Sequence, residues 1–161
     1  MPEEKPITVE PYALLYTRAG AGVCLRDPLT GKVGVIFVEL PDGMTLEHAL
    51  AGDQPERPDT AALLTGLLAG MECRVRLVII NARRDEVFYA RVAVEASNEV
   101  MKKLLELDAR PSDALMLAAR LGVPVKVTSS VWEGMENILP QLEQLKEDSV
   151  DSRAPVFVAD L

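Results

Sequence analysis

The fold of this chain is decided by one stretch, Leu107-Asp-Ala-Arg-Pro-Ser-Asp-Ala-Leu-Met-Leu-Ala-Ala-Arg-Leu-Gly-Val-Pro-Val-Lys-Val127. Apolar side chains recur at helical spacing from Ser112 to Leu121, which predicts an amphipathic helix. We expect Ser112 to cap the start of this helix and Gly122 to end it. A short strand is predicted over residues 123–128. A helix followed at once by a strand indicates a mixed fold.

Strands dominate the region before this stretch. Residues 73–80 alternate and then become wholly apolar, which predicts a strand that grows more buried along its length. A turn over residues 81–86 leads to a second strand over 87–96. Residues 99–107 have helical propensity, yet their place before a new helix suits a strand, so both assignments stay open.

The N-terminal part predicts a strand, a hairpin and two helices. The strand covers residues 7–17 with a bulge or an edge at Pro11, and the hairpin turns at Asp27–Gly31. Met44–Ala51 is predicted to form a short helix that Gly52 stops. Asp59 is expected to cap a second helix over residues 60–69, with leucines 63, 64, 67 and 68 on one face.

The C-terminal part predicts a helix and an uncertain end. Ser130-Val-Trp-Glu133 has the pattern of a capping box, and Pro140 must kink or split the helix that follows. Residues 154–160 form either an added strand or a loose tail. We expect one domain over residues 1–147, with 148–161 as a C-terminal tail. The predicted class is α+β: a compact domain with a mixed, partly antiparallel sheet packed against a few helices.

Composition excludes several classes of protein. The 161 residues are 48% apolar and 26% charged, which is typical of a globular domain. No apolar run approaches the roughly 20 residues that cross a bilayer, and the polar start does not resemble a secretory leader. We therefore expect a cytoplasmic protein with no membrane partner. A single histidine, His48, effectively excludes a Cys/His zinc site and gives no support to a serine or cysteine triad.

The net charge of −8 disfavours simple binding to nucleic acid, because the average field repels phosphate. Basic residues are concentrated between residues 72 and 126, where ten lysines and arginines accompany eight acidic residues. A local basic surface could form there. On composition alone, the simpler interpretation is that these side chains are solvated strand and turn positions.

The junction before the 112–121 helix holds the strongest candidate site. Asp108 and Asp113 could converge on a divalent cation, Mg²⁺ or Mn²⁺, and Arg110 between them could clamp a phosphate. A structural interpretation competes with this one and is favoured by residue types alone. In it Ser112 caps the helix, Asp113 complements the helix dipole, and Asp108 pairs with Arg110.

Further basic side chains are candidates for substrate binding. Arg57 could lie beside a phosphate, or it could simply belong to the turn before a capped helix. Arg74 and Arg76, with Arg83 and Arg84, could contact a nucleic-acid backbone or form a solvated strand face. Trp132 and Met135 are expected to anchor the last helix or to take part in a subunit contact.

The run Arg110-Pro-Ser-Asp-Ala114, followed by Leu117-Ala-Ala-Arg120 and Val123-Pro-Val125, resembles the signature of the bifunctional nuclease domain family. Arg57-Pro58, the leucine-rich helix, the strand ending in Val78-Ile-Ile80 and Phe88-Tyr-Ala90 occur in the family's order, so the resemblance covers roughly residues 33–131. It implies a compact α+β domain that self-associates into a homo-oligomer. It also implies a nuclease that cleaves RNA and DNA.

The sequence departs from the family pattern at one place. After Arg57-Pro58, relatives carry a His-Asp pair where this chain has Ala61 and Ala62, and this removes a general base and a metal ligand. The nuclease hypothesis therefore assigns catalysis to Asp108, Asp113 and Arg110. It assigns substrate binding to the residues that remain, which are Arg57, Ser112, Arg74 and Arg76. The alternative is a catalytically silent relative that acts as an oligomeric binding or assembly module.

Overall fold

The computed structural model describes residues 5–145 and 156–158. Its strands are β1 (Ile7–Thr17), β2 (Gly20–Arg26), β3 (Val33–Val38), β4 (Cys73–Arg84), β5 (Val87–Ser97), β6 (Lys102–Ala109), β7 (Val125–Val127) and β8 (Val156–Val158). Its helices are α1 (Leu40–Leu50), α2 (Thr60–Gly70), α3 (Pro111–Leu121), α4 (Ser129–Gly134) and α5 (Leu139–Glu143). The predicted α+β class is confirmed.

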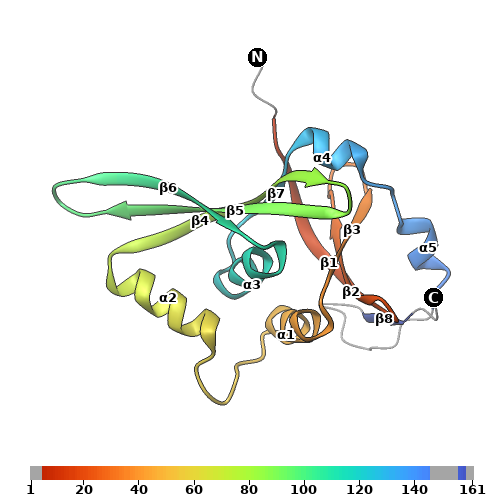
Figure 1. Cartoon of the computed structure of the whole chain (residues 1–161), viewed down its shortest axis with the longest axis horizontal. Helices are drawn as coiled ribbons and strands as arrows, with labels where there is room; N and C mark the ends of the chain where they lie inside the picture. The colour runs from red at the N-terminus through yellow and green to blue at the C-terminus, as the bar shows by residue number, and fades with distance from the viewer. Residues whose placement is uncertain (1–4, 146–155, 159–161) are drawn as a thin grey trace.

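One mixed sheet organises the domain. The strand order is β3-β2-β1-β7-β4-β5-β6, and β8 pairs with β1 beside this path. The short strand β7 joins the two halves, because it runs antiparallel to β1 and parallel to β4. Helices α1, α2 and α3 lie on one side of the long strands β4 to β6, with α4 on the other (Figure 1). This order leaves β6 at an edge of the sheet.

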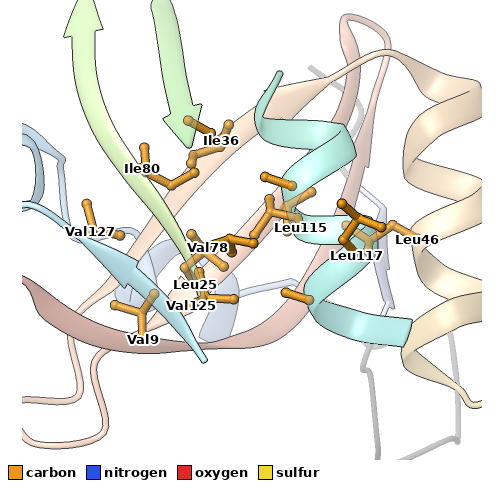
Figure 2. Close-up of a cluster of buried hydrophobic side chains, with 14 of the residues drawn as sticks. Val9, Leu25, Ile36, Leu46, Val78, Ile80, Leu115, Leu117, Val125 and Val127 are labelled. Atoms are coloured by element: carbon orange, nitrogen blue, oxygen red, sulfur yellow. The ribbon is translucent and has the colours of Figure 1, made fainter. Parts of the chain in front are cut away.

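Helix α3 packs the sheet and fixes the junction in front of it. Ala114, Leu115, Leu117 and Ala118 are buried along one face of the helix. Figure 2 shows Leu115 and Leu117 among side chains from β1, β4 and β7, with Leu46 of α1 beside them. Because the apolar face of α3 is locked in this core, the segment that joins β6 to α3 has a fixed position.

The N-terminal predictions hold with changed helix boundaries. The register of β1 against β2 shifts between Pro11 and Ala13, so the bulge predicted at Pro11 is present. Helix α1 starts at Leu40 rather than Met44, because Pro41 lies in the first turn, where its missing N–H is not needed. Asp59 caps α2 as predicted, since its carboxylate accepts the Ala62 N–H at 2.9 Å.

Two predicted caps are wrong. Helix α3 begins at Pro111, so Arg110 is its N-cap residue and Ser112 already lies inside the first turn. Proline suits the first helical position because its φ is already helical and its missing N–H would have no partner within the helix. Helix α4 begins at Ser129 after Thr128, and no side-chain cap bond forms. The predicted capping box over Ser130–Glu133 is therefore absent, although Gly122 ends α3 at φ 66° as expected.

Two open assignments are resolved, and the start of one predicted turn is corrected. Residues 102–109 form the strand β6, because their backbone pairs with β5 along the whole segment. Strand β4 runs on to Arg84, beyond the predicted turn at 81, and turns tightly at Asp85 with φ 56°. Pro140 splits the last helix into α4 and α5.

The described part of the C-terminal segment is the added strand. In β8, Val156 and Phe157 are buried, and the strand runs parallel to β1 at Leu14–Tyr16. The rest of the predicted tail, residues 148–155 and 159–161, lies outside the described residues. Within the described chain, no helix is both long and apolar enough to span a membrane.

Candidate active site

A cavity of about 740 Å³ opens where three distant segments meet, with Ala19 of the β1–β2 turn beside them. These are the end of β3 with the start of α1, the start of β5, and the junction between β6 and α3. Its lining comprises Ala19, Ile36, Phe37, Val38, Glu39, Asp42, Glu86, Val87, Phe88, Tyr89, Asp108, Ala109, Arg110, Pro111 and Ser112. Three predicted site residues, Asp108, Arg110 and Ser112, thus share one cavity.

Arg110 is held in a fixed orientation by two acidic partners. Its Nε and Nη2 donate to the two carboxylate oxygens of Asp113 at 2.8 and 3.0 Å. Its Nη1 donates to Oδ2 of Asp42, on α1, at 3.4 Å. The hydrogen bonds and charge of Asp113, together with the charge of Asp42, raise the pKa of Arg110. The guanidinium is therefore permanently charged and oriented at the cavity wall.

Asp108 lies apart from this pair. Its side chain is 93% exposed, and its Oδ1 is 3.4 Å from Nε of Arg91 on the neighbouring strand β5. Arg91 also donates to Glu106 at 3.1 Å. The interpretation that Asp108 pairs with Arg110 is therefore replaced by a pairing with Arg91. The open carboxylate of Asp108 is accessible from solvent at the edge of the cavity.

The two candidate metal ligands do not form a ready donor set. Asp108 and Asp113 both line a second hollow of about 400 Å³, which also includes Ala61, one of the two alanines at the family's His-Asp place. Both oxygens of Asp113, however, accept bonds from Arg110. In the described ranges, no three His, Cys, Asp or Glu residues come together as a metal site. The residues as positioned do not fit a bound Mg²⁺ or Mn²⁺.

Aromatic side chains line a further part of the cavity, here called the aromatic rim, and two arginines lie against them. Phe37 and Tyr89 line the cavity and are 53% and 44% exposed. The guanidinium of Arg84 lies 5.5 Å from the ring centre of Tyr89, and that of Arg83 lies 5.0 Å from the ring centre of Phe88. Arg83 and Arg84 therefore bring positive charge to this rim, whereas the lining itself is acidic through Glu39, Asp42, Glu86 and Asp108.

The remaining predicted substrate ligands are not part of this cavity. Arg57 is exposed in the loop between α1 and α2. Arg74 lines a separate hollow of about 590 Å³ near the end of α2. Arg76 pairs with Glu95 at 3.2 Å. None of the three lines the 740 Å³ cavity, so the structure does not bring the predicted basic set together.

Sequence reasoning missed Asp42 and the two exposed aromatics. Asp42 follows Leu40-Pro41, a helix-start signal that lies before the helix predicted over Met44–Ala51. Recognising that helix would have directed attention to its first-turn acid. Phe37 and Tyr89 lie on predicted strands, but alternation alone does not say which strand ends meet across a cavity.

A comparison with known protein families identifies the family of this chain. Residues 23–138 match the model of the bifunctional nuclease domain, which extends beyond the recognised motifs on both sides. The chain belongs to the bifunctional nuclease domain family. The family segment includes the whole cavity lining except Ala19.

Relatives of the bifunctional nuclease domain occur in bacteria and plants. An uncharacterized protein of Mycobacterium tuberculosis is 29% identical over 136 residues, which cover 84% of this chain and 74% of that protein. Bifunctional nuclease 1 of Arabidopsis thaliana is 26% identical over 117 residues, or 73% of this chain and 33% of the plant protein. Bifunctional nuclease 2 of the same plant is 29% identical over 93 residues, which cover 58% of this chain and 28% of the relative.

Proposed function

We propose that this protein is a nuclease that hydrolyses phosphodiester bonds of RNA or DNA in the 740 Å³ cavity. One observation carries the proposal. In a chain of the bifunctional nuclease domain family, the segment Asp108–Ser112 presents an open carboxylate, an oriented guanidinium and a hydroxyl to one cavity. The matched plant relatives bear the name of bifunctional nucleases. The comparisons lend no support to a role without catalysis.

Arg110 binds the scissile phosphate in this proposal. Its weakest hydrogen bond is the 3.4 Å contact with Asp42, while Asp113 holds the other side of the guanidinium at 2.8 and 3.0 Å. A phosphate oxygen can thus take the place of Asp42 without disturbing the orientation set by Asp113. The Ser112 hydroxyl, in the first turn of α3, lies on the same wall and donates a further hydrogen bond.

Asp108 acts as the general base. Its carboxylate takes a proton from a water molecule as the water oxygen bonds to phosphorus. The bond between phosphorus and the leaving sugar oxygen breaks, and that oxygen takes its proton from solvent. Arg110 offsets the charge that develops on the phosphoryl oxygens in the transition state. No step passes through a metal ion, because the donor set as folded does not fit one.

The aromatic rim provides the surface on which bases bind. Exposed Phe37 and Tyr89 can stack unpaired bases, and each stacked base contributes on the order of 1–3 kcal/mol. Arg83 and Arg84 compensate for part of the acidic lining. Because the whole chain carries a net charge of −8, substrate binding depends on these few cations and should weaken steeply with salt.

The test is cleavage of labelled single-stranded RNA and duplex DNA by the wild type, Asp108→Ala and Glu106→Gln. We expect Asp108→Ala to lower the rate by about 100-fold or more, the usual contribution of a general base. Its melting temperature should not change, because the side chain is 93% exposed. Glu106→Gln is the matched control, since it alters the other acidic partner of Arg91 outside the cavity lining.

Equal rates for the wild type and Asp108→Ala would contradict the proposed base, and no cleavage by the wild type would contradict the nuclease. The same assay with Mg²⁺, with Mn²⁺ and with a chelator tests the metal expected from Asp108 and Asp113. Activity that persists in the chelator would agree with the observed positions of Asp108 and Asp113, which do not fit a metal ion. Activity that only a metal restores would mean that Asp113 exchanges Arg110 for the cation.

A further inference from the structure

Strand β6 is an edge strand with one free side. It pairs with β5 along its whole length and ends the strand order of the sheet. Across residues 5–145 and 156–158, no segment pairs with its other side. A free edge of eight residues presents unpaired backbone N–H and C=O groups and is a ready template for another strand.

Apolar side chains accompany this edge. Leu104 is 66% exposed, Leu107 47% and Met101, just before the strand, 60%. The apolar surface continues onto α2, because Leu107 and Leu64 line the same 400 Å³ hollow. Leu63 and Leu67 of that helix are 72% and 58% exposed. Solvated edges are protected by charged side chains, proline, bulges or a covering segment, and β6 carries charged residues as well; the exposed apolar side chains beside them indicate a surface that another chain covers.

The charges of β6 are arranged so that the strand complements itself. Lys102 and Lys103 lie at its start, and Glu106 and Asp108 lie towards its end. When two copies of such a strand pair antiparallel, the basic end of each faces the acidic end of the other. A parallel pairing would place like charges side by side. The occupant that this edge fits is therefore a second copy of the same chain.

Symmetry restricts the register of such a pair. A two-fold axis perpendicular to the sheet keeps each side chain on its own face of the sheet. Two residues that lie opposite one another must therefore both have even numbers or both have odd numbers. A pair centred on Leu104 sets this leucine against its own copy, Lys102 against Glu106 and Met101 against Leu107. Each contact is then apolar with apolar or basic with acidic, apart from Lys103 against Leu105.

We propose that two copies of this chain associate through antiparallel pairing of their β6 strands, centred on Leu104, to form one continuous sheet. The family resemblance leads us to expect self-association, but it does not say which surface is used. The free edge of β6, its leucines and its charge pattern assign the surface. Asp108 lies outside the paired residues 101–107, so the pairing does not use it. The proposal therefore stands independently of nuclease activity.

Sedimentation equilibrium of the full chain with charge-reversed variants tests the pairing. Lys102→Glu and Glu106→Lys each place like charges opposite one another twice across the two-fold axis. We expect each to weaken the dimer by about tenfold or more. Mixing the two variants should restore a dimer, because both cross pairs are then opposite in sign. The double variant Lys102→Glu/Glu106→Lys should dimerise on its own for the same reason, and it confirms that the substituted chain folds.

A disulfide tests the register. In a background of Cys73→Ser, Leu104→Cys places two thiols opposite one another at the axis, within reach of a disulfide. The control is Leu29→Cys, a turn position that is 93% exposed and far from β6 in the chain. We expect oxidation to cross-link Leu104→Cys and leave Leu29→Cys as monomer. A wild type that stays monomeric, a dimer indifferent to both charge reversals, or equal cross-linking of the two cysteine variants would overturn the proposal.

Discussion

Arg110 shows how a single residue acquires a defined role. It is the N-cap residue of α3, but it caps nothing with its side chain. A guanidinium has only donors and cannot accept a backbone N–H, so the side chain pairs instead with Asp113 three residues on and with Asp42 from α1. Such a fixed planar fork suits a phosphate better than a mobile lysine would, because its donors are already oriented.

Cys24 provides a pH prediction. Burial raises the pKa of its thiol from 9.0 to about 12. The unfolded chain therefore loses this proton at lower pH than the folded one, and the associated stability is intact below pH 9.0 and is lost as the pH rises towards 12. We expect the free energy of unfolding to fall across this window, measured by urea titration, and to fall less in Cys24→Ala. Equal slopes for the two proteins would contradict the assignment.

At the scale of elements, helix α1 is set against β2 by a glycine. A Cβ added at Gly43 would meet the Cβ of Ala21 at 2.2 Å, so the helix would have to move. We expect Gly43→Ala to destabilise the protein by about 1–3 kcal/mol, as overpacked sites do. The shift should also carry Asp42 away from Arg110. Urea unfolding measures the first effect.

The control for that substitution is Gly66→Ala in α2. A Cβ at Gly66 meets no atom within 4 Å, so only helix propensity changes. Alanine should therefore stabilise the protein by about 0.8–1 kcal/mol. The two substitutions are chemically identical and differ only in the space around them. If both substitutions changed the free energy of unfolding in the same direction, close packing of α1 on β2 would not be the reason for the glycine at position 43.

At the scale of the whole molecule, β8 completes a second apolar cluster. Phe157 packs with Ala13, Leu15, Cys24, Val33 and Leu142, which come from three strands and a helix. We expect Phe157→Ala to cost about 3 kcal/mol, in the range of buried aromatic truncations. Leu29→Ala, at a position 93% exposed, should change the unfolding free energy by less than about 0.5 kcal/mol. If Phe157→Ala were as stable as the wild type, β8 would contribute little to the free energy of unfolding.

Much of the fold follows from local pattern. The strand bulge at Pro11, the turn at Asp27–Gly31, the Asp59 cap and the Gly122 stop are all expressed within a few residues, so sequence predicts them. The misassigned starts of α1 and α3 have one cause. In both, a proline in the first turn marks the start of the helix through its fixed φ and missing N–H, and polar capping residues give no sign of such a start.

The sequence alone determined that this is an α+β domain of the bifunctional nuclease family, and it predicted Asp108–Asp113 as the candidate site. Only the tertiary structure decided the partners. Asp108 meets Arg91 because β6 lies in register beside β5, and Arg110 meets Asp42, 68 residues away, because α1 packs on α3. Strand order and helix packing set such long-range contacts, whereas periodicity and turn residues act over only a few positions.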